Sequence, residues 1–419
     1  MDSDRPRGDL RERRAPWDGR RVVLGVCGGI AAYKVIQVAR DLTLLGATVD
    51  VILTEAASRF VTPLTFEGVT GRRPLQDLFS AEGAALHVRL AQEADAVCVA
   101  PATADFLARS ASGRADDLLT TLLLATQAPV VVAPAMNDGM FAHPQTQANL
   151  AHLRELGHFI VGPAQGRLAV GEGTGPGRME DPPTIVEAVG RALEPASPLR
   201  GRTVLITAGP TREALDPVRF LGNRSSGKMG YALAQAAWRR GAEVILVSGP
   251  SALSPPFGVR TVQVESAEEM GDAVLARIEE ADVAIYAAAV VDYRPEERHT
   301  SKMKRERLGD SVELRLVMNP DIASQANTRL KPGGVAVGFA LETDDLEANA
   351  RRKLDRKAFH LIVANRAGEA GSGFDSDTNK VMIFDDRGGA LDLPKASKAV
   401  VASRILDAVE ERLGGTSGG

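Results

Sequence analysis

The first residues of the chain whose type and spacing could do chemistry are two glycines, Gly28 and Gly29. They follow the apolar run 22–27, and a segment with helical periodicity begins soon after them. Glycines in this position often let backbone N–H groups approach a phosphate at a helix N-terminus, where the helix dipole favours negative charge. The spacing is not GxGxxG and no acidic residue closes the second strand, so a mononucleotide is favoured over a dinucleotide. A plain tight turn is the alternative interpretation.

Two later strand ends also carry small and polar residues. Residues 100–105 follow one buried apolar run, and residues 134–140 follow the next. Ligands bind open α/β sheets at the carboxyl ends of parallel strands, so these ends predict one shared crevice. His87 lies on a helical face that points toward the sheet, although a histidine that caps the core would look the same. On its position alone, Asn137 could be a helix N-cap.

The second half contains a sequence like that of a P-loop, because residues 222–228 fit GxxxxGK. We do not interpret it as a P-loop, since Met229 stands where a hydroxyl residue would bind Mg²⁺ and the loop lies far from the strand that should lead into it. Lys353 and Lys357 are four residues apart, so one helix face would present both. That pair, like the charged run 301–307, could equally be a solvated surface.

Both halves open with the same order of elements, which would position these residues. In the first half an apolar run, a helix and the strand 49–53 follow one another; in the second half the strand 203–208, a helix over 231–240 and the strand 244–247 do so. Each is a βαβ unit, so the predicted fold class is α/β, with two Rossmann-like domains, mostly parallel sheets and right-handed crossovers. Further buried strands are expected at 96–100, 130–133, 283–287, 335–339 and 361–364.

The length of 419 residues is too great for one ordinary core and suits two domains. The short, proline-containing stretch 193–200 is the predicted linker, so the domains are expected at 17–192 and 201–413. Residues 1–16 are expected to be a disordered tail. Residues 414–419, which are rich in glycine and serine, are expected to be a flexible one.

The composition excludes several classes of protein. Aromatic residues make up 4% of the chain and the formal net charge is −4 without a large basic block, which argues against nucleic acid as a partner. No apolar stretch approaches the ~20 residues of a membrane helix, and the N-terminal segment matches neither a signal peptide nor a transit peptide. Cys27 and Cys98 form no disulfide framework and no zinc motif. A soluble, cytoplasmic protein with no membrane partner is therefore expected.

The first half resembles the flavin-dependent cysteine decarboxylases over nearly all of residues 20–190. The resemblance is carried by GGIAAYK (28–34), TEAA (54–57), APATAD (100–105) and PAMNxxM (134–140). It implies a flavodoxin-like domain that binds FMN and acts on a thiol next to a carboxylate. It also implies that His87 is the catalytic base and that Asn137 hydrogen-bonds the substrate's carboxylate or amide. The implied flavin contacts are Gly28, Gly29, Thr54, Pro101, Ala102, Thr103, Asp105 and Met136.

The implied chemistry depends on a flap whose segment ends in GPGRM, which here includes Arg178 and Met179. Oxidation of the thiol to a thioaldehyde, with hydride transfer to the flavin, would create the electron sink that decarboxylation needs. In the family a flap cysteine completes the later reductive step, and Val170 stands at that position in this chain. Valine cannot donate a proton, so Glu172 or water would have to replace the cysteine, or the decarboxylase half is impaired.

The second half resembles the phosphopantothenate–cysteine ligases over most of residues 201–410. The matching segments are ITAGPTRE (206–213), LDPVR (215–219), AAAVVDYR (287–294), NPDI (319–322), GFALET (338–343) and KLDRKAFHLIVAN (353–365). The implied reaction joins cysteine to 4′-phosphopantothenate through an acyl-cytidylate made from CTP, with Mg²⁺ and lysines offsetting the negative charge. Lys302 is implied as the catalytic lysine and Asn223 as a ligand of the acyl-cytidylate, while no metal ligand is assigned. The implied CTP contacts are Ala287, Ala288, Asp292, Lys302, Asn319, Pro320, Asp321, Ile322, Phe339, Lys353 and Lys357.

The order of the two halves is similar to that of the bifunctional decarboxylase–ligase family of coenzyme A biosynthesis. This resemblance implies a homo-oligomer with trimeric flavin domains and dimeric ligase domains. The alternatives are a flavin-binding regulator without turnover and a nicotinamide dehydrogenase with two Rossmann units. The complete ligase half argues against the regulator, and the missing GxGxxG argues against the dehydrogenase.

Overall fold

The structure is a computed structural model that describes residues 15–79, 85–168, 171, 173–194, 196–304, 311–342, 344–366 and 376–414. The chain divides into two compact units, Met1–Glu194 and Pro195–Gly419. Within the predicted linker, Leu193 is buried in the core of the first unit and Leu199 in that of the second. The predicted tails lie largely outside the described residues. None of the helices in the described ranges has the length and apolar character needed to span a bilayer.

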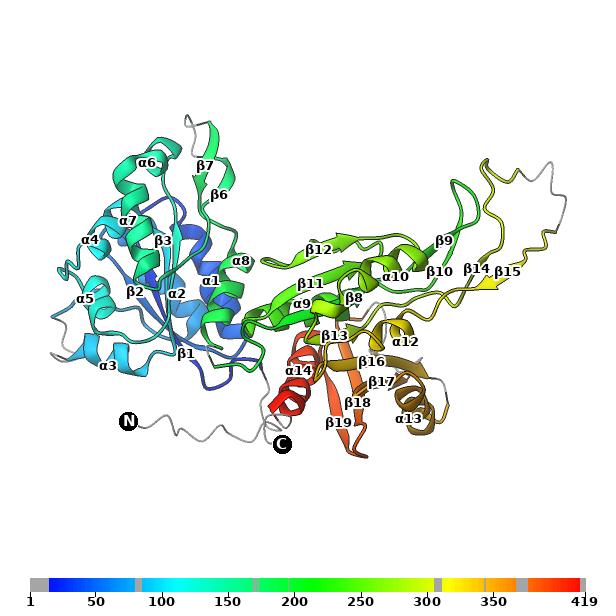
Figure 1. The fold of residues 1–419 in the computed structure, drawn as a ribbon. Helices are drawn as coiled ribbons and strands as arrows, with labels where there is room; N and C mark the ends of the chain where they lie inside the picture. The colour runs from blue at the N-terminus through cyan, green and yellow to red at the C-terminus, as the bar shows by residue number, and fades with distance from the viewer. Residues whose placement is uncertain are drawn as a thin grey trace. The chain divides into compact units, whose positions relative to one another are not determined.

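The first unit is built on a five-stranded parallel sheet (Figure 1). Its strand order is β2–β1–β3–β4–β5, so the order reverses between β1 and β3 and opens a crevice at their carboxyl ends. The elements are β1 (Arg21–Val26), α1 (Ala32–Leu44), β2 (Thr48–Leu53), η1 (Ala57–Arg59), α2 (Pro63–Thr70), α3 (Leu86–Glu93), β3 (Ala96–Ala102), α4 (Ala104–Ala111), α5 (Leu118–Ala125), β4 (Val130–Pro134), α6 (Asp138–Ala142), α7 (Pro144–Glu155), β5 (Phe159–Ile160), β6 (Ala164–Arg167), β7 (Thr174–Arg178) and α8 (Pro182–Ala192).

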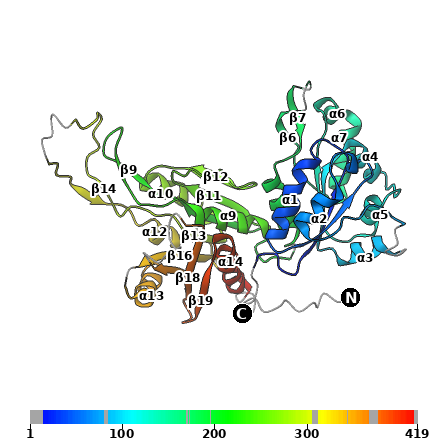
Figure 2. The ribbon, with the colours of Figure 1, turned by 180° about the vertical axis from the view of Figure 1, so that it is seen from behind.

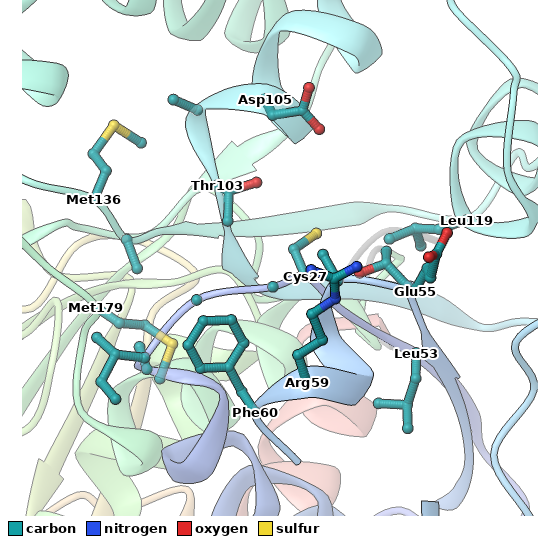
Figure 3. A pocket seen from close by; sticks show the side chains of 18 of the residues that line it. Cys27, Leu53, Glu55, Arg59, Phe60, Thr103, Asp105, Leu119, Met136 and Met179 are labelled. Atoms are coloured by element: carbon teal, nitrogen blue, oxygen red, sulfur yellow. The ribbon is translucent and has the colours of Figure 1, made fainter. Parts of the chain in front are cut away.

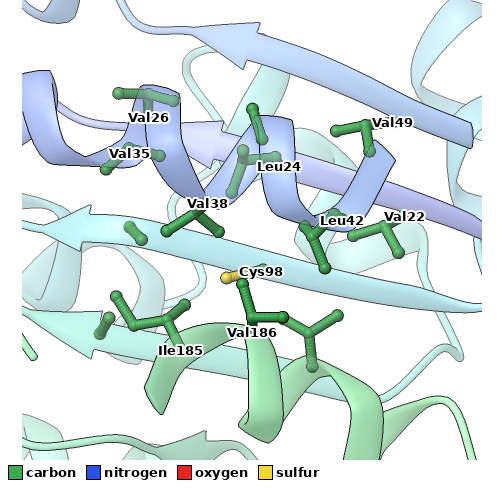
Figure 4. Packing of buried hydrophobic residues seen from close by; sticks show 14 of the residues in the cluster. Val22, Leu24, Val26, Val35, Val38, Leu42, Val49, Cys98, Ile185 and Val186 are labelled. Carbon is green, nitrogen blue, oxygen red and sulfur yellow. The ribbon is translucent and has the colours of Figure 1, made fainter. Parts of the chain in front are cut away.

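Both faces of this sheet are buried. Val22 and Leu24 of β1 pack against α1 and α8, whereas Val23 faces the side covered by α3, α4, α5 and α7. Figure 4 shows the first of these faces, with Val38 and Leu42 of α1 lying against the strands. Burial on both faces explains why the strands of this unit are continuous apolar runs in the sequence.

Eight strands form the sheet of the second unit, in the order β12–β11–β8–β13–β16–β17–β18–β19 (Figures 1 and 2). The first six are parallel, and β18 and β19 are added antiparallel at one edge. Helices α9 and α14 cover one face, and α10, α12 and α13 cover the other. The elements of the sheet and its helices are β8 (Thr203–Ala208), α9 (Lys228–Arg239), β11 (Glu243–Ser248), β12 (Arg260–Gln263), α10 (Ala267–Leu275), η2 (Ile278–Glu280), β13 (Val283–Tyr286), α12 (Ile322–Asn327), β16 (Val335–Glu342), α13 (Leu346–Arg356), β17 (Leu361–Arg366), β18 (Thr378–Asp385), β19 (Ala390–Ser397) and α14 (Lys398–Gly414).

Two antiparallel ribbons extend the second unit beyond its sheet. One pairs β9 (Arg212–Ala214) with β10 (Phe220–Gly222), and the other pairs β14 (Tyr293–Pro295) with β15 (Leu316–Met318). The ribbons lie side by side (Figures 1 and 2). Each ribbon follows directly after a parallel strand, β8 or β13. The chain therefore leaves the sheet at its carboxyl edge, forms the ribbon and returns to the same edge.

The predicted α/β class with two mostly parallel sheets is confirmed, and the first sheet has the predicted flavodoxin-like order. Strands β3 and β16 continue beyond the predicted ends, to Ala102 and Glu342. The sequence does not predict β12 and β19, because these segments carry many exposed polar residues. It does not predict the ribbons, whose strands are three residues long each. Nor does it predict β18, although residues 381–384 form an apolar run.

Candidate active sites in the two units

A cavity of about 1530 Å³ lies at the carboxyl ends of β1, β2, β3 and β4 in the first unit (Figure 3). The structure therefore brings together residues that the sequence places at separate strand ends. The predicted site residues that line this cavity are Gly28, Gly29, Thr54, Thr103, Asp105, Met136, Asn137, Arg178 and Met179.

Gly28 lies so close to the loop after β2 that no side chain would fit. A Cβ atom on Gly28 would lie 2.4 Å from the Cβ atom of Ala56 and 2.7 Å from its carbonyl carbon. The loop is held in place because the N–H of Thr54 donates to the carbonyl of Val26 at 3.1 Å and the N–H of Ala57 donates to Thr54 Oγ1 at 3.2 Å. Two backbones that approach closely ahead of a helix N-terminus form a cradle suited to a phosphate. These residues fit a mononucleotide such as FMN.

Part of the cavity wall is a network around the guanidinium of Arg109. Arg109 pairs with Asp105 at 3.0 Å, Asp116 at 3.0 Å and Asp117 at 2.8 Å. The predicted flavin contact Asp105 is thus already partnered by a cation. Burial raises the pKa of the Cys27 thiol, which also lines the cavity, to about 12. The thiol therefore stays protonated at neutral pH and is a poor nucleophile.

Three predicted residues of the first unit do not line the cavity. Pro101 and Ala102 are buried within β3, because the strand is longer than its apolar run predicts. The imidazole of His87, on α3, is half-buried, and its Nδ1 atom has no hydrogen-bond partner among the described residues. The role of His87 as a base stays a prediction. Val170 and Glu172 of the predicted flap lie outside the described residues.

In the second unit, the predicted lysines lie between β16, α12 and α13. The ammonium of Lys353 donates to the main-chain carbonyl of Phe339 at 2.8 Å, and Lys357 forms a 3.0 Å ion pair with Asp321. Burial lowers the pKa of Lys353, the charge of Lys357 lowers it further, and the charge of Asp292 opposes this shift. These five predicted residues therefore share one electrostatic environment.

The loop after β13 gathers a second group of predicted residues. Asn223 donates through Nδ2 to the carbonyls of Ala289 at 3.3 Å and Val290 at 3.0 Å. The N–H of Ala288 donates to Thr207 Oγ1 at 3.2 Å, which ties this loop, with the adjoining residue Ala287, to the end of β8. The β9–β10 ribbon and the loop after β13 thus meet through Asn223.

Lys302 lies on the segment between β14 and β15 and is exposed. The N–H of its neighbour Met303 donates to Asp216 Oδ2 at 3.0 Å, and Arg219 donates to the carbonyl of Met303 at 2.9 Å. The hydrogen bond from Met303 is the largest of the causes that hold the pKa of the Asp216 carboxyl well below its usual range. Lys302 is therefore held beside the turn of the β9–β10 ribbon, and its catalytic role stays a prediction.

Two predicted CTP contacts have side chains that are committed to the fold. Asn319 is buried, its Nδ2 donates to the carbonyl of Val291 at 2.8 Å, and its Oδ1 accepts from Arg294 at 3.2 Å. Ile322, the first residue of α12, is buried in the core that α12 shares with α10. The structure does not support nucleotide contacts by these two side chains, and Pro320 between them is half-buried.

A set of close glycine contacts at the carboxyl end of β8 was not predicted. A Cβ atom on Gly227 would lie 3.4 Å from the Cα atom of Gly209, and one on Gly249 would lie 1.8 Å from the carbonyl oxygen of Pro210. The GxxxxGK sequence is distant from β8 along the chain, but its Gly227 comes near the end of that strand in space because the β9–β10 ribbon loops out and returns. The sequence held a signal for these contacts, because Gly209 and Gly249 each come directly after a strand and Gly227 comes directly before α9.

Two family models match the chain. The model described as Flavoprotein matches residues 11–194, and that of the DNA/pantothenate metabolism flavoprotein C-terminal domain matches residues 199–413. The coenzyme A biosynthesis bifunctional protein CoaBC of Vibrio vulnificus (strain CMCP6) is 46% identical over 399 residues, which is 94% of this chain and 98% of that relative. The chain belongs to the CoaBC family.

CoaBC proteins of other bacteria are similar to the same extent. The relative from Bacillus subtilis (strain 168) is 44% identical and covers 94% of this chain and 97% of its own, and that from Mycobacterium bovis (strain ATCC BAA-935 / AF2122/97) is 45% identical with 95% and 98% covered. A crystal structure of the C-terminal domain of a CoaBC protein covers 51% of this chain and 97% of its own, at 44% identity and a TM-score of 0.44.

As a CoaBC protein, the chain is a bifunctional enzyme of coenzyme A biosynthesis. Its flavoprotein half is the phosphopantothenoylcysteine decarboxylase, and its second half is the phosphopantothenate–cysteine ligase. The alternatives of a decarboxylase half impaired by Val170 and of a flavin-binding regulator are not favoured.

Proposed function

We propose that the second unit activates the carboxylate of 4′-phosphopantothenate with CTP, and that the first unit decarboxylates the resulting cysteine amide with FMN. The observation that carries the flavin part is the cavity where the first sheet reverses its order, because Gly28, Gly29 and Thr54 line it together. The close approach of Gly28 to Ala56 leaves no room for a side chain on this turn. The lysine set around β16 and α13 supports the nucleotide part.

In the first unit, the task of the protein is to bind and orient. When bound, FMN would supply a hydride acceptor, which allows the substrate thiol to be oxidised before carbon dioxide leaves. Gly28, Gly29 and Thr54 would hold its phosphate. Asn137 Oδ1 accepts from the N–H of Gly139 at 2.8 Å, so Asn137 is the N-cap of α6. Its Nδ2 group would donate to the substrate carboxylate, so the two interpretations of Asn137 are compatible.

In the second unit, the carboxylate must be activated because hydroxide is a poor leaving group. A carboxylate oxygen would attack the α-phosphate of CTP and release pyrophosphate, and the amine of cysteine would then displace CMP. Lys353 and Lys357 would reduce the repulsion between the triphosphate and the carboxylate, and Asn223 would hold the acyl-cytidylate. Gly227, at the N-terminus of the 12-residue helix α9, would offer backbone N–H groups to a nucleotide phosphate.

The finer features of this enzyme are also proposals. Mg²⁺ would bind with CTP, since this ion commonly keeps water and substrate phosphates as ligands. A cytoplasmic location is supported by the two cysteines, Cys27 and Cys98, which are free thiols. A homo-oligomer is supported by the exposed apolar side chains of the β14–β15 ribbon.

Mass spectrometry of the products tests the proposed function. The FMN-loaded protein is given 4′-phosphopantothenate, cysteine, CTP and Mg²⁺, with a parallel reaction that lacks CTP. CTP-dependent formation of 4′-phosphopantetheine would support both steps. Accumulation of phosphopantothenoylcysteine, or of a species two hydrogens short of the product, would show that a chain with Val170 does not complete the decarboxylase reaction. Consumption of 4′-phosphopantothenate without CTP would refute the nucleotide part.

A further inference from the structure

The cavity of the first unit contains cations that the protein neutralises and cations that it does not. Arg109 and Arg114 pair with aspartates at 2.7–3.0 Å, and Lys34 pairs with an aspartate at 3.4 Å. Arg59 and Arg167 also line the cavity, but no ion pair or side-chain hydrogen bond joins either guanidinium to another residue in the described part of the chain. These two positive charges are therefore available to a ligand.

Arg59 lies beside the turn that contains Gly28. It is the last residue of η1, and its N–H donates to the carbonyl of Ala56 at 3.3 Å. That carbonyl oxygen lies 2.9 Å from the position that a Cβ atom on Gly28 would take. Figure 3 shows the guanidinium of Arg59 pointing into the cavity on the side of Cys27. A charge that has no counter-ion in the described part of the chain thus lies within one helical turn of the backbone cradle.

The backbone that carries Arg59 is anchored on both sides. Ser58 Oγ accepts a hydrogen bond from Gln76 Nε2 at 2.7 Å and donates to the carbonyl of Thr54 at 3.4 Å. The N–H of Phe60 donates to the carbonyl of Ala57 at 2.9 Å. The loop presents the guanidinium from a fixed position, which lowers the ordering cost when a ligand binds.

We infer that Arg59 binds a phosphate monoester in this cavity. This inference rests on the proposed function, which brings two phosphate monoesters to the site: FMN and the phosphopantothenoyl substrate. A guanidinium binds phosphate oxygens through paired N–H donors, and among the described residues no carboxylate pairs with Arg59. Its place beside Gly28 favours the phosphate of the flavin, so Arg59 would select FMN over riboflavin.

Flavin titrations test this inference without reference to turnover. Full-length protein freed of flavin is titrated with FMN and with riboflavin, followed by quenching of flavin fluorescence. Riboflavin has the same ring and no phosphate, so the ratio of the two affinities isolates the phosphate contact, and retained riboflavin binding shows that a variant is folded. Arg59→Gln is expected to lower this ratio about tenfold, which is the loss expected when a hydrogen bond to a charged group, at the weak end of its range, is removed. Arg59→Lys keeps the charge and is expected to retain most of the ratio.

Arg167→Gln is the matched control, because it removes the other uncompensated guanidinium of the cavity, on β6. It is expected to leave the ratio of FMN to riboflavin affinity unchanged. In a second arm, the KM of decarboxylation is compared for 4′-phosphopantothenoylcysteine and its dephosphorylated form, in wild type and Arg59→Gln. A loss of discrimination between these two substrates alone would assign Arg59 to the substrate phosphate.

A loss in either arm supports the inference and names the phosphate that is bound. If Arg59→Gln changes neither ratio while the wild-type protein binds FMN and decarboxylates its substrate, the inference is overturned and the proposed function stands. If the wild-type protein binds neither flavin, the proposed function fails, and the inference fails with it.

Discussion

At the scale of single residues, Gly28 tests the phosphate cradle. Gly28→Ala places a Cβ atom 2.4 Å from that of Ala56. Because the backbone and Cβ atoms of Ala56 cannot rotate away, the two loops must separate, at a cost of about 1–3 kcal/mol that is typical of overpacking. We expect weaker FMN binding, measured as the flavin absorbance that stays with the protein through gel filtration.

The control for this substitution is Gly68→Ala in α2, where a Cβ atom would meet nothing within 4 Å. It should retain the flavin and gain up to about 1 kcal/mol of stability from the better helix propensity of alanine. Full retention of flavin by Gly28→Ala would contradict the cradle.

His360 should make the second unit sensitive to acid. Its Nδ1 atom accepts a hydrogen bond from the N–H of Ala336 at 2.9 Å, which requires a neutral imidazole. Burial lowers the pKa of His360 below 6.5, Arg412 lowers it further, and Asp386 opposes the shift. The unfolded chain therefore binds more protons than the folded one in the window from pH 6.5 down to this lowered pKa, so stability should fall as the pH decreases through it.

Thermal unfolding measured above and below pH 6.5 checks this expectation. His360→Gln should reduce the loss of stability on acidification, because the titrating group is gone. His299→Gln, at an exposed position of the same unit, should leave the loss as it is in wild type. The explanation fails if the two variants show the same pH dependence.

At the scale of elements, Asn327 links β13, α12 and α13. Its Oδ1 atom accepts from the hydroxyl of Tyr286 at 2.9 Å, and its Nδ2 atom donates to the carbonyl of Lys357 at 2.8 Å. Lys357 in turn pairs with Asp321, the N-cap of α12. This chain of contacts fixes α12 against the end of the helix that carries Lys353.

Asn327→Ala should raise the KM for CTP. The substitution leaves Tyr286 and the carbonyl of Lys357 without their partner, which typically costs about 1–3 kcal/mol, and Lys357 would lose its fixed position. Pyrophosphate release at varied CTP concentration measures the effect. Gln325→Ala, at an exposed position on the same helix, is the control. Equal KM values for the two variants would show that Asn327 does not position Lys357.

At the scale of the whole molecule, the β14–β15 ribbon bears on assembly. Tyr293 pairs with Met318 and Pro295 pairs with Leu316 across the ribbon, so their side chains share one face. Tyr293, Leu316 and Met318 are 49%, 43% and 72% exposed. Exposed apolar faces often mark protein–protein interfaces, so the predicted pairing of ligase domains would bury this face.

Met318→Glu should therefore reduce the mass of the full-length assembly, because a carboxylate would have to be buried without a partner. Light scattering after gel filtration measures this mass. Leu391→Glu, on β19 and 37% exposed, is the control that adds the same charge elsewhere in the unit. An unchanged mass for Met318→Glu would remove the ribbon from the interface.

The sequence by itself determines the class of fold and the general position of the flavin site. Apolar runs separated by helical segments can be buried only in parallel sheets covered on both faces, so both sheets follow from local patterns. Gly28, Thr54 and Met136 follow separate strands, and the carboxyl ends of parallel strands meet at one edge, which is why they line one cavity.

Only the tertiary structure decides which distant segments become neighbours. A Cβ atom on Gly227 would lie 3.4 Å from Gly209 although a ribbon separates the two glycines in the chain. Asn319 is buried, and its Nδ2 donates to the carbonyl of Val291 in another loop. Arg109 pairs with aspartates, whereas no described residue forms an ion pair with Arg59. His360 accepts a hydrogen bond from the backbone of an adjacent strand. The partners, burial and pKa of a side chain depend on how these segments pack, and that packing is a property of the whole unit rather than of the residues beside it in the chain.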